Sequence, residues 1–353
     1  MGRLRTILSV AVALAWAACA AAGLPPREAR RVSAPAAQTI HPPSSARWVR
    51  RPTAHPAGPL GFASRLKGQS DTIAPIAHAF ASESMAPAIP AEAPSAPRRL
   101  VIRPDSDGDW GGASLADASK VLHSAAGTLW DEVPERRLAP IDVRPKGGPI
   151  VLYRRGPGGA YQVRLNTGGT YWCQYAFQFA HEFCHILCRS GKHADTDLEK
   201  MDGQNMWFEE SVCETASLFA LRRMATRWAQ RPPYPNWRDF APSLRSYAEE
   251  RIRAAPLPEG MTLAAWYAKH ADHLRKESCD RPKNRIVAGV LLPMFEAAPD
   301  RWQAVQYLNV GARPEPRSFR EYLSDWRQHC PARHRGFVRQ VAEAFGVRLP
   351  VDE

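Results

Sequence analysis

Two short segments of the chain combine residue types that bind metals and activate water. Residues 181–185 read His-Glu-Phe-Cys-His, and residues 207–214 read Trp-Phe-Glu-Glu-Ser-Val-Cys-Glu. On a helix, His181 and His185 project from one face, so both imidazoles can reach a single metal ion. Glu182 lies about 100° round the helix from His181, where its carboxylate can hold a water molecule rather than the metal.

The second segment can supply a third, anionic ligand. Two neutral imidazoles and one carboxylate leave the fourth tetrahedral position open, which is the layout of a catalytic Zn²⁺ site. Apolar residues flank the first segment at 175–180 and 186–188, so this segment is predicted to form a buried helix that ends near Gly191. The alternative is a buried helix whose two histidines are merely hydrogen-bonded.

These motifs resemble the gluzincin group of zinc metallopeptidases, which includes the thermolysin-like enzymes and the alanyl aminopeptidases. In the aminopeptidases the second helix begins Trp-aliphatic-Asn-Glu-Gly, and that Glu binds zinc. Residues 207–211 match this pattern at the Trp and the Glu, so the resemblance implies Glu210 as the third ligand, with Glu209 as the alternative. It also implies that Glu214, one turn further on, orients a zinc-bound imidazole through its far N–H.

The chain departs from neighbouring families in ways that narrow the expected activity. The aminopeptidase signature Gly-x-Met-Glu-Asn, which captures a free amine, is replaced at residues 159–163 by Gly-Ala-Tyr-Gln-Val. An endopeptidase is therefore favoured over an aminopeptidase. A metzincin would need Gly at 188 and His at 191, where this chain has Cys188 and Gly191. His193 is an alternative third ligand, although its offset fits no familiar zinc-peptidase spacing.

The order of predicted elements indicates an α+β fold. A strand at 99–103, a helix at 114–130 with Ser114 as its N-cap, strands at 141–143 and 150–153, and a strand at 161–165 precede the helix that carries His181. This is the order of a zincin-like catalytic lobe with a small mixed sheet, which is expected to span residues 99–230 and to include a second zinc helix at 207–228. A mainly helical C-terminal lobe is expected over 231–353, with helices at 242–254, 262–276, 284–297, 317–328 and 335–345.

Two further site roles are expected outside the zinc helices. Residues 161–165 alternate like an edge strand, so Val163, Arg164 and Leu165 are predicted to pair with an extended substrate backbone. The C-terminal lobe should donate a hydrogen bond to the tetrahedral oxyanion.

Tyr267 and His270, three residues apart on one predicted helix, are the candidates for this donor. Tyr247 and His273 are alternatives.

The first hundred residues read as targeting and linker sequence. Residues 1–22 combine Arg3 and Arg5 with an apolar run and small residues, which is typical of a signal peptide. Cys19 is an alternative lipoprotein anchor. Residues 23–98 are rich in Pro and Ala and are predicted to form a disordered linker or pro-segment. No later stretch is apolar enough to span a membrane, so an exported protein, periplasmic or secreted, is expected.

Six cysteines follow Cys19, which permits disulfides in an exported chain. The sequence favours a bridge from Cys184 or Cys188 to Cys213, and a second from Cys279 to Cys330; metal binding by Cys184 or Cys188 is the alternative.

The chain has a formal charge of +12, but its basic residues are not interleaved with aromatic residues as in nucleic-acid-binding sequences. Nucleic acid is therefore not an expected partner. The predicted function is zinc-dependent hydrolysis of peptide bonds with Glu182 as general base. A catalytically inactive zinc-binding protein of the cell envelope and a closed structural metal site are the alternatives.

Overall fold

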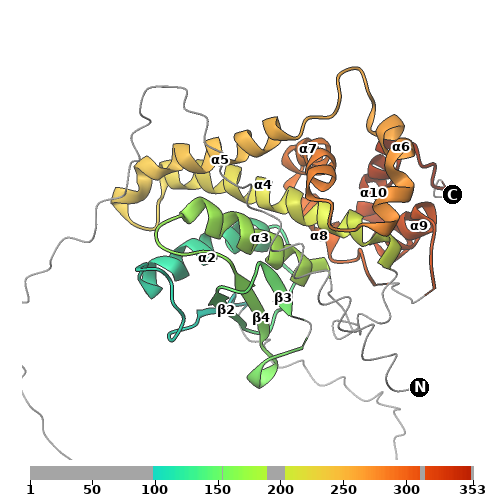
Figure 1. Cartoon of the computed structure of the whole chain (residues 1–353). Coiled ribbons are helices and arrows are strands. Elements are labelled where there is room, and N and C mark those ends of the chain that lie inside the picture. Colours follow the sequence, from blue (N-terminus) through green and yellow to red (C-terminus); the bar gives the residue numbers. More distant parts are fainter. Residues whose placement is uncertain (1–97, 153, 189–202, 311–314, 351–353) are drawn as a thin grey trace, which may run out of the picture. The chain divides into compact units, whose positions relative to one another are not determined.

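A small mixed sheet lies against a group of helices (Figure 1). The computed structural model describes residues 98–152, 154–188, 203–310 and 315–350. The expected signal peptide, the lipoprotein cysteine and nearly all of the expected linker lie outside these residues. No helix in the described ranges is both long and apolar enough to cross a bilayer.

The sheet has four strands in the order β1-β2-β4-β3. Strands β1 (Ile102–Pro104), β2 (Ile141–Pro145) and β4 (Tyr161–Leu165) run parallel, and β3 (Ile150–Leu152) pairs antiparallel with β4. The mixed sheet and the helical character of the remaining chain agree with the predicted α+β class.

The predicted edge position of β4 is wrong. Val163 pairs with Val143 of β2 on one side and with Val151 of β3 on the other, so the backbone around Val163, Arg164 and Leu165 is already paired. The edge strand on this side is β3. The prediction failed because alternating apolar and polar residues show only that one face of the strand is buried. They do not show whether the strand has a neighbour on one side or on both sides.

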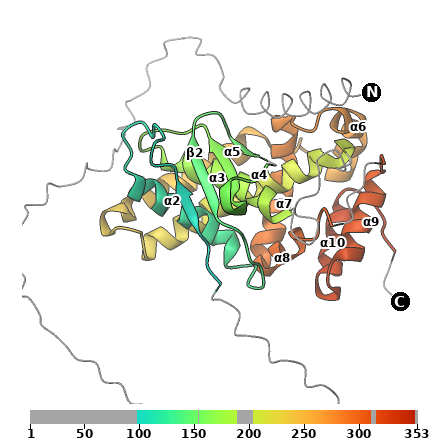
Figure 2. The ribbon, with the colours of Figure 1, turned by 90° about the horizontal axis from the view of Figure 1, so that it is seen from below.

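Three helices carry or enclose the two motif segments, residues 181–185 and 207–214. Helix α2 (Leu115–Trp130) begins after Ser114, whose hydroxyl accepts a hydrogen bond from the Asp117 N–H as predicted. Helix α3 (Trp172–Cys188) contacts β3 and β4 on one side and α4 (Met206–Gln230) on the other. Both views show α3 between the sheet and the long α4 (Figures 1 and 2). Because neighbours enclose α3, nearly all of its side chains are buried, which explains its apolar sequence.

After α4, the described residues form helices joined by turns and loops, and none of them forms a strand. Its helices pack on α4 and on one another, and the buried apolar residues form one cluster that continues across residue 230. The bounds are α5 (Ala241–Ala254), α6 (Leu263–Lys276), α7 (Arg281–Ala297), α8 (Trp302–Val305), α9 (Phe319–His329) and α10 (Ala332–Ala344), with short 3-10 turns at Pro157–Gly159, Gly203–Asn205, Pro235–Phe240 and Pro299–Arg301.

Both predicted disulfides are wrong. Cys184, Cys188 and Cys213 are free thiols, as is Cys330. The Sγ atoms of Cys184 and Cys188 are 4.0 Å apart, and a disulfide bond requires about 2.05 Å. An even number of cysteines therefore did not predict which of them pair. Cys184, Cys188, Cys213 and Cys330 are buried in the core as free thiols.

Candidate metal centre

Helix α3 presents His181 and His185 as neighbours on its α4-facing side. Their ring centroids are 5.0 Å apart with an interplanar angle of 71°. The exposed fraction is 7% for His181 and 0% for His185, so both imidazoles are removed from bulk water. This placement follows from the four-residue spacing, which stacks side chains one turn apart.

Helix α4 brings Glu210 to the same point. Its Oε2 lies 3.2 Å from Nε2 of His181, and its Oε1 lies 3.4 Å from Nε2 of His185. Ligand bonds of about 2.0–2.1 Å around a tetrahedral zinc place neighbouring ligand atoms roughly 3.3–3.4 Å apart. The distances between these three side chains are therefore compatible with one metal ion between them, and their ligand atoms all lie within 4.8 Å of one another.

The charges of the triad also suit a cation. Burial alone would raise the pKa of Glu210, but the charges and hydrogen bonds of His185 and His181 hold it well below its usual range. Burial alone would lower the pKa of His185, yet Glu210 and Glu209 raise it well above its usual range. The ionised Glu210 carboxylate supplies negative charge for a cation, and the proton favoured on His185 is one that a bound metal ion would displace.

A carboxylate stands behind each histidine. Glu209 Oε1 is 2.6 Å from Nδ1 of His185, and Glu214 Oε2 is 3.8 Å from Nδ1 of His181. An imidazole that donates from Nδ1 keeps its lone pair on Nε2, the atom that faces Glu210. Glu214 lies on the Nδ1 side of His181, but 3.8 Å is too long for a hydrogen bond, and His181 Nδ1 makes none with the described residues. Glu209, the alternative ligand, lies on the far side of His185 from the candidate metal position.

These outer carboxylates are held by residues that sequence reasoning missed. The Asn309 amide donates to Glu209 Oε2 at 2.8 Å, and the Tyr322 hydroxyl donates to Asn309 at 3.1 Å. Arg285 of α7 donates to Glu214 at 3.0 Å. None of these residues belongs to a short motif, so no local signal in the sequence marks them.

Glu182 lies beside the triad on α3 and is only 2% exposed. Burial raises the pKa of its carboxyl above the usual range, although the charges of His181 and His185 oppose the rise. Arg281, the first residue of α7, opposes it as well, so its guanidinium acts electrostatically on this carboxyl. The Oε2 atom of Glu182 is buried and makes no hydrogen bond within the described part of the chain.

The expected oxyanion donors have other surroundings. The Tyr267 ring stacks on Trp207 at 5.5 Å and lies 5.1 Å from Phe319, and burial raises the pKa of Tyr267 to about 12. The His270 ring lies 4.8 Å from Trp266. No hydrogen bond or ion pair within the described part of the chain joins Tyr267 or His270 to the candidate metal triad, and their ring contacts are with aromatic residues.

A separate pocket of about 320 Å³ lies between α2 and α4. Its lining includes Lys120, His123, Arg227 and Trp228, and none of the predicted site residues lines it. The metal centre is instead a buried cluster between α3 and α4.

Comparisons with protein-family models, with curated proteins and with solved structures give no match to this chain. The arrangement of the residues themselves therefore carries the functional argument. Buried His and Glu side chains form a group that could hold a metal ion, and an acid of raised pKa, Glu182, interacts electrostatically with it.

Proposed function

We propose that this protein is a zinc-dependent peptidase of the gluzincin type, with zinc on His181, His185 and Glu210 and with Glu182 as general base. The observation that carries the proposal is the convergence of both histidine Nε2 atoms on the Glu210 carboxylate at zinc-compatible distances. The electrostatic interaction of Glu182 with these ligands supports a catalytic arrangement over a closed structural site.

When bound, zinc supplies a Lewis acid that activates water and polarises a carbonyl group. The Glu182 carboxylate accepts a proton from the attacking water and delivers it to the leaving amine. A raised pKa favours this double role, because a carboxyl with a pKa nearer to neutrality is a stronger base and still an acid. The low exposure of the cluster strengthens each of these electrostatic interactions.

Because β4 is paired on both sides, we infer that β3 rather than β4 pairs with the substrate backbone. Strand β3 is the edge of the sheet and contacts α3, so an extended peptide paired with Ile150–Leu152 would run alongside the helix that carries His181 (Figure 1). The strand and helix order before α3 supports a zincin-like arrangement of this part. The missing amine-capturing motif favours an endopeptidase, and the N-terminal sequence favours an exported one.

The test uses the full chain, purified and loaded with Zn²⁺, and incubated with a diverse peptide mixture. We expect chelator-sensitive cleavage by the unchanged protein. Glu182→Gln should keep one zinc and lose roughly a hundredfold or more of the activity, because it cannot accept the proton. Glu259→Gln, which alters an exposed glutamate, is the matched control.

His181→Ala should lose both zinc and activity. Full activity in Glu182→Gln would refute the proposal. Stoichiometric zinc without cleavage of any peptide would instead favour the alternative of an inactive zinc-binding protein of the cell envelope.

A further inference from the structure

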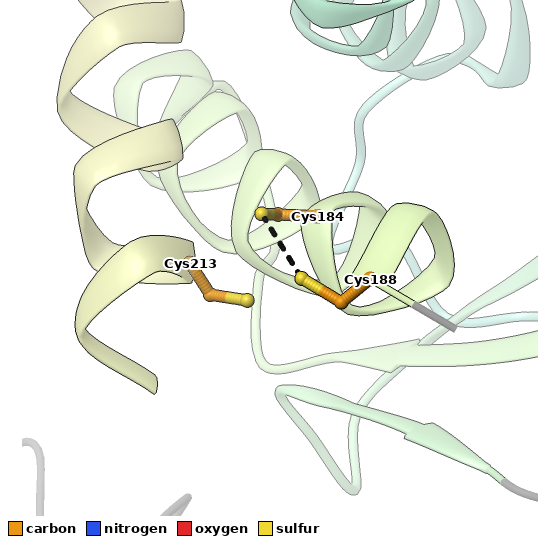
Figure 3. Close-up of side chains that lie close together, drawn as sticks. All are labelled: Cys184, Cys188 and Cys213. Atoms are coloured by element: carbon orange, nitrogen blue, oxygen red, sulfur yellow. Dashed lines mark hydrogen bonds between the residues drawn. The ribbon is translucent and has the colours of Figure 1, made fainter. Parts of the chain in front are cut away.

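Three cysteine side chains meet between α3 and α4, next to the candidate metal centre. Cys184 and Cys188 project from α3 and Cys213 from α4, and the three sulfur atoms face one another (Figure 3). The Sγ atoms of Cys184 and Cys188 are 4.0 Å apart, and all three sulfurs lie within 4.8 Å of one another. Each side chain has an exposed fraction of 0%.

The helical repeat explains why the cluster forms. Cys184 and Cys188 are four residues apart and therefore lie on one face, and at about 100° per residue that face adjoins the one that carries His181 and His185. Cys213 follows Glu210 by three residues on α4, so it points to the same interface one turn further along. The packing of α3 against α4 thus places two clusters side by side. One consists of His181, His185 and Glu210, and the other of the three cysteines.

The geometry suits a metal better than simple packing. A buried cysteine commonly serves as a small apolar side chain, and Cys330 belongs to the hydrophobic core in this way. Three mutually close sulfurs are a different arrangement, because they form the donor set that thiophilic ions select. With metal–sulfur bonds of about 2.3 Å, a planar three-coordinate ion holds its sulfurs roughly 4 Å apart. Small side-chain rotations would bring the three thiols to that spacing.

We propose that Cys184, Cys188 and Cys213 form a second metal site, which binds one Cu(I) ion through three sulfur ligands. Soft thiolate donors favour Cu(I), and zinc would need a fourth ligand to complete a tetrahedron. The three cysteines belong to the buried apolar core, which keeps bulk water away from the ion. Each sulfur that binds the ion releases its proton.

This site is chemically distinct from the triad of His181, His185 and Glu210. The two ligand sets share no residue, and one is built of nitrogen and oxygen whereas the other is built of sulfur. Cys213 also lies within 4.8 Å of donor atoms of His185 and Glu209, so a mixed set of these three residues is the competing geometry. Cys184 and Cys188 belong only to the sulfur site, which makes Cys184 the discriminating position.

The test titrates the reduced full-length protein with Cu(I), without oxygen and against a coloured Cu(I) chelator. The unchanged protein should bind one Cu(I) in competition with the chelator, and X-ray absorption should report sulfur ligands alone. Cys184→Ser and Cys213→Ser should each weaken binding by roughly a hundredfold or more, beyond the 10–100-fold typical of outer-shell changes. Cys184→Ala and Cys213→Ala, which preserve an apolar side chain, repeat the measurement if a serine variant does not fold.

Cys173→Ser is the matched control, because Cys173 is a free thiol of α3 outside the cluster. It should bind Cu(I) as the unchanged protein does. His181→Ala should also keep the Cu(I) site, which separates this proposal from the peptidase proposal. Undiminished affinity in the Cys184 variants, nitrogen or oxygen ligands in the absorption spectrum, or no binding by the unchanged protein would overturn it.

Discussion

Oε1 of Glu209 lies 2.6 Å from Nδ1 of His185, on the opposite side of the imidazole from Glu210. Both side chains have an exposed fraction of 0%, and the second oxygen of Glu209 accepts a hydrogen bond from Asn309. A buried carboxylate held at both oxygens cannot easily turn toward a metal without leaving the Asn309 amide unsatisfied. Glu209 therefore lies on the Nδ1 side of His185 and Glu210 on the Nε2 side, so under the proposed function Glu210 binds the metal and Glu209 orients the imidazole.

This separation predicts the metal affinity of Glu209→Gln. The amide keeps the size of the side chain but removes the negative charge that fixes and polarises His185. Zinc affinity should fall about 10–100-fold, the range seen when an outer-shell partner of a metal ligand is changed. Competition against a coloured zinc chelator measures this change.

Glu210→Gln is the comparison variant for this measurement, since Glu210 is the proposed ligand. It should lose much more affinity than Glu209→Gln. The reverse order would assign the metal-binding role to Glu209 and the outer role to Glu210.

The ion pair between Arg285 and Glu214 predicts a stability change. The two side chains are 3.0 Å apart, and their exposed fractions are 25% and 3%. Arg285→Met leaves a buried carboxylate without its cation, so the free energy of unfolding should fall by about 3 kcal/mol, the lower end for a broken buried pair. Urea unfolding of the metal-free protein measures it.

The double variant Arg285→Met with Glu214→Gln is the control, because it removes both charges together. It should recover most of the lost stability. A loss of similar size in the single and double variants would mean that Arg285 acts through packing rather than through Glu214.

The parts of the site that the sequence could predict depend on local geometry. His181 and His185 share a helix face in any fold, and Ser114 caps its helix through neighbouring atoms. Asn309 lies 100 residues from Glu209 in the chain. A single long-range hydrogen bond produces no sequence pattern from which it could be predicted. Long-range partners of this kind follow only from the packed structure.

The edge-strand prediction and the disulfide predictions failed for related reasons. The alternation in β4 records which side chains are buried, whereas the neighbours β2 and β3 are set by the whole sheet. The cysteines of α3 and α4 do lie together as the sequence suggested, but as thiols. Sequence spacing predicted proximity in that case and could not predict the bond.

The surroundings of Tyr267 predict that it is not the oxyanion donor. Its ring packs against Trp207, Phe319 and Phe345, so its main contribution is apolar contact. Tyr267→Phe keeps that contact, and peptidase turnover should stay within about twofold, whereas loss of an oxyanion donor costs about a hundredfold or more. Steady-state kinetics on a peptide that the unchanged protein cleaves decides between these values.

A carboxyl at the start of α7 predicts how stability depends on pH. Asp280 caps the helix by accepting from the Lys283 N–H at 3.2 Å, and it also pairs with the Lys283 ammonium at 2.6 Å and with His273 at 2.7 Å. Burial opposes ionisation, but the hydrogen bonds from Lys283 and His273 prevail and lower the pKa of Asp280. The folded state therefore favours the ionised carboxylate of Asp280. The stability that this carboxylate contributes is present at pH values above its ordinary pKa of 3.8 and is lost as the pH falls through the lowered pKa.

Asp280→Asn keeps a good capping oxygen but removes the charge. The variant should be less stable than the unchanged protein by about 0.5–1 kcal/mol at neutral pH, and this difference should shrink as the pH falls below about 4. Urea unfolding across this pH range measures both proteins. Glu259→Gln, at an exposed position, should show no comparable difference. A difference that grows on acidification would mean that Asp280 is held in its protonated form, contrary to the hydrogen bonds it accepts.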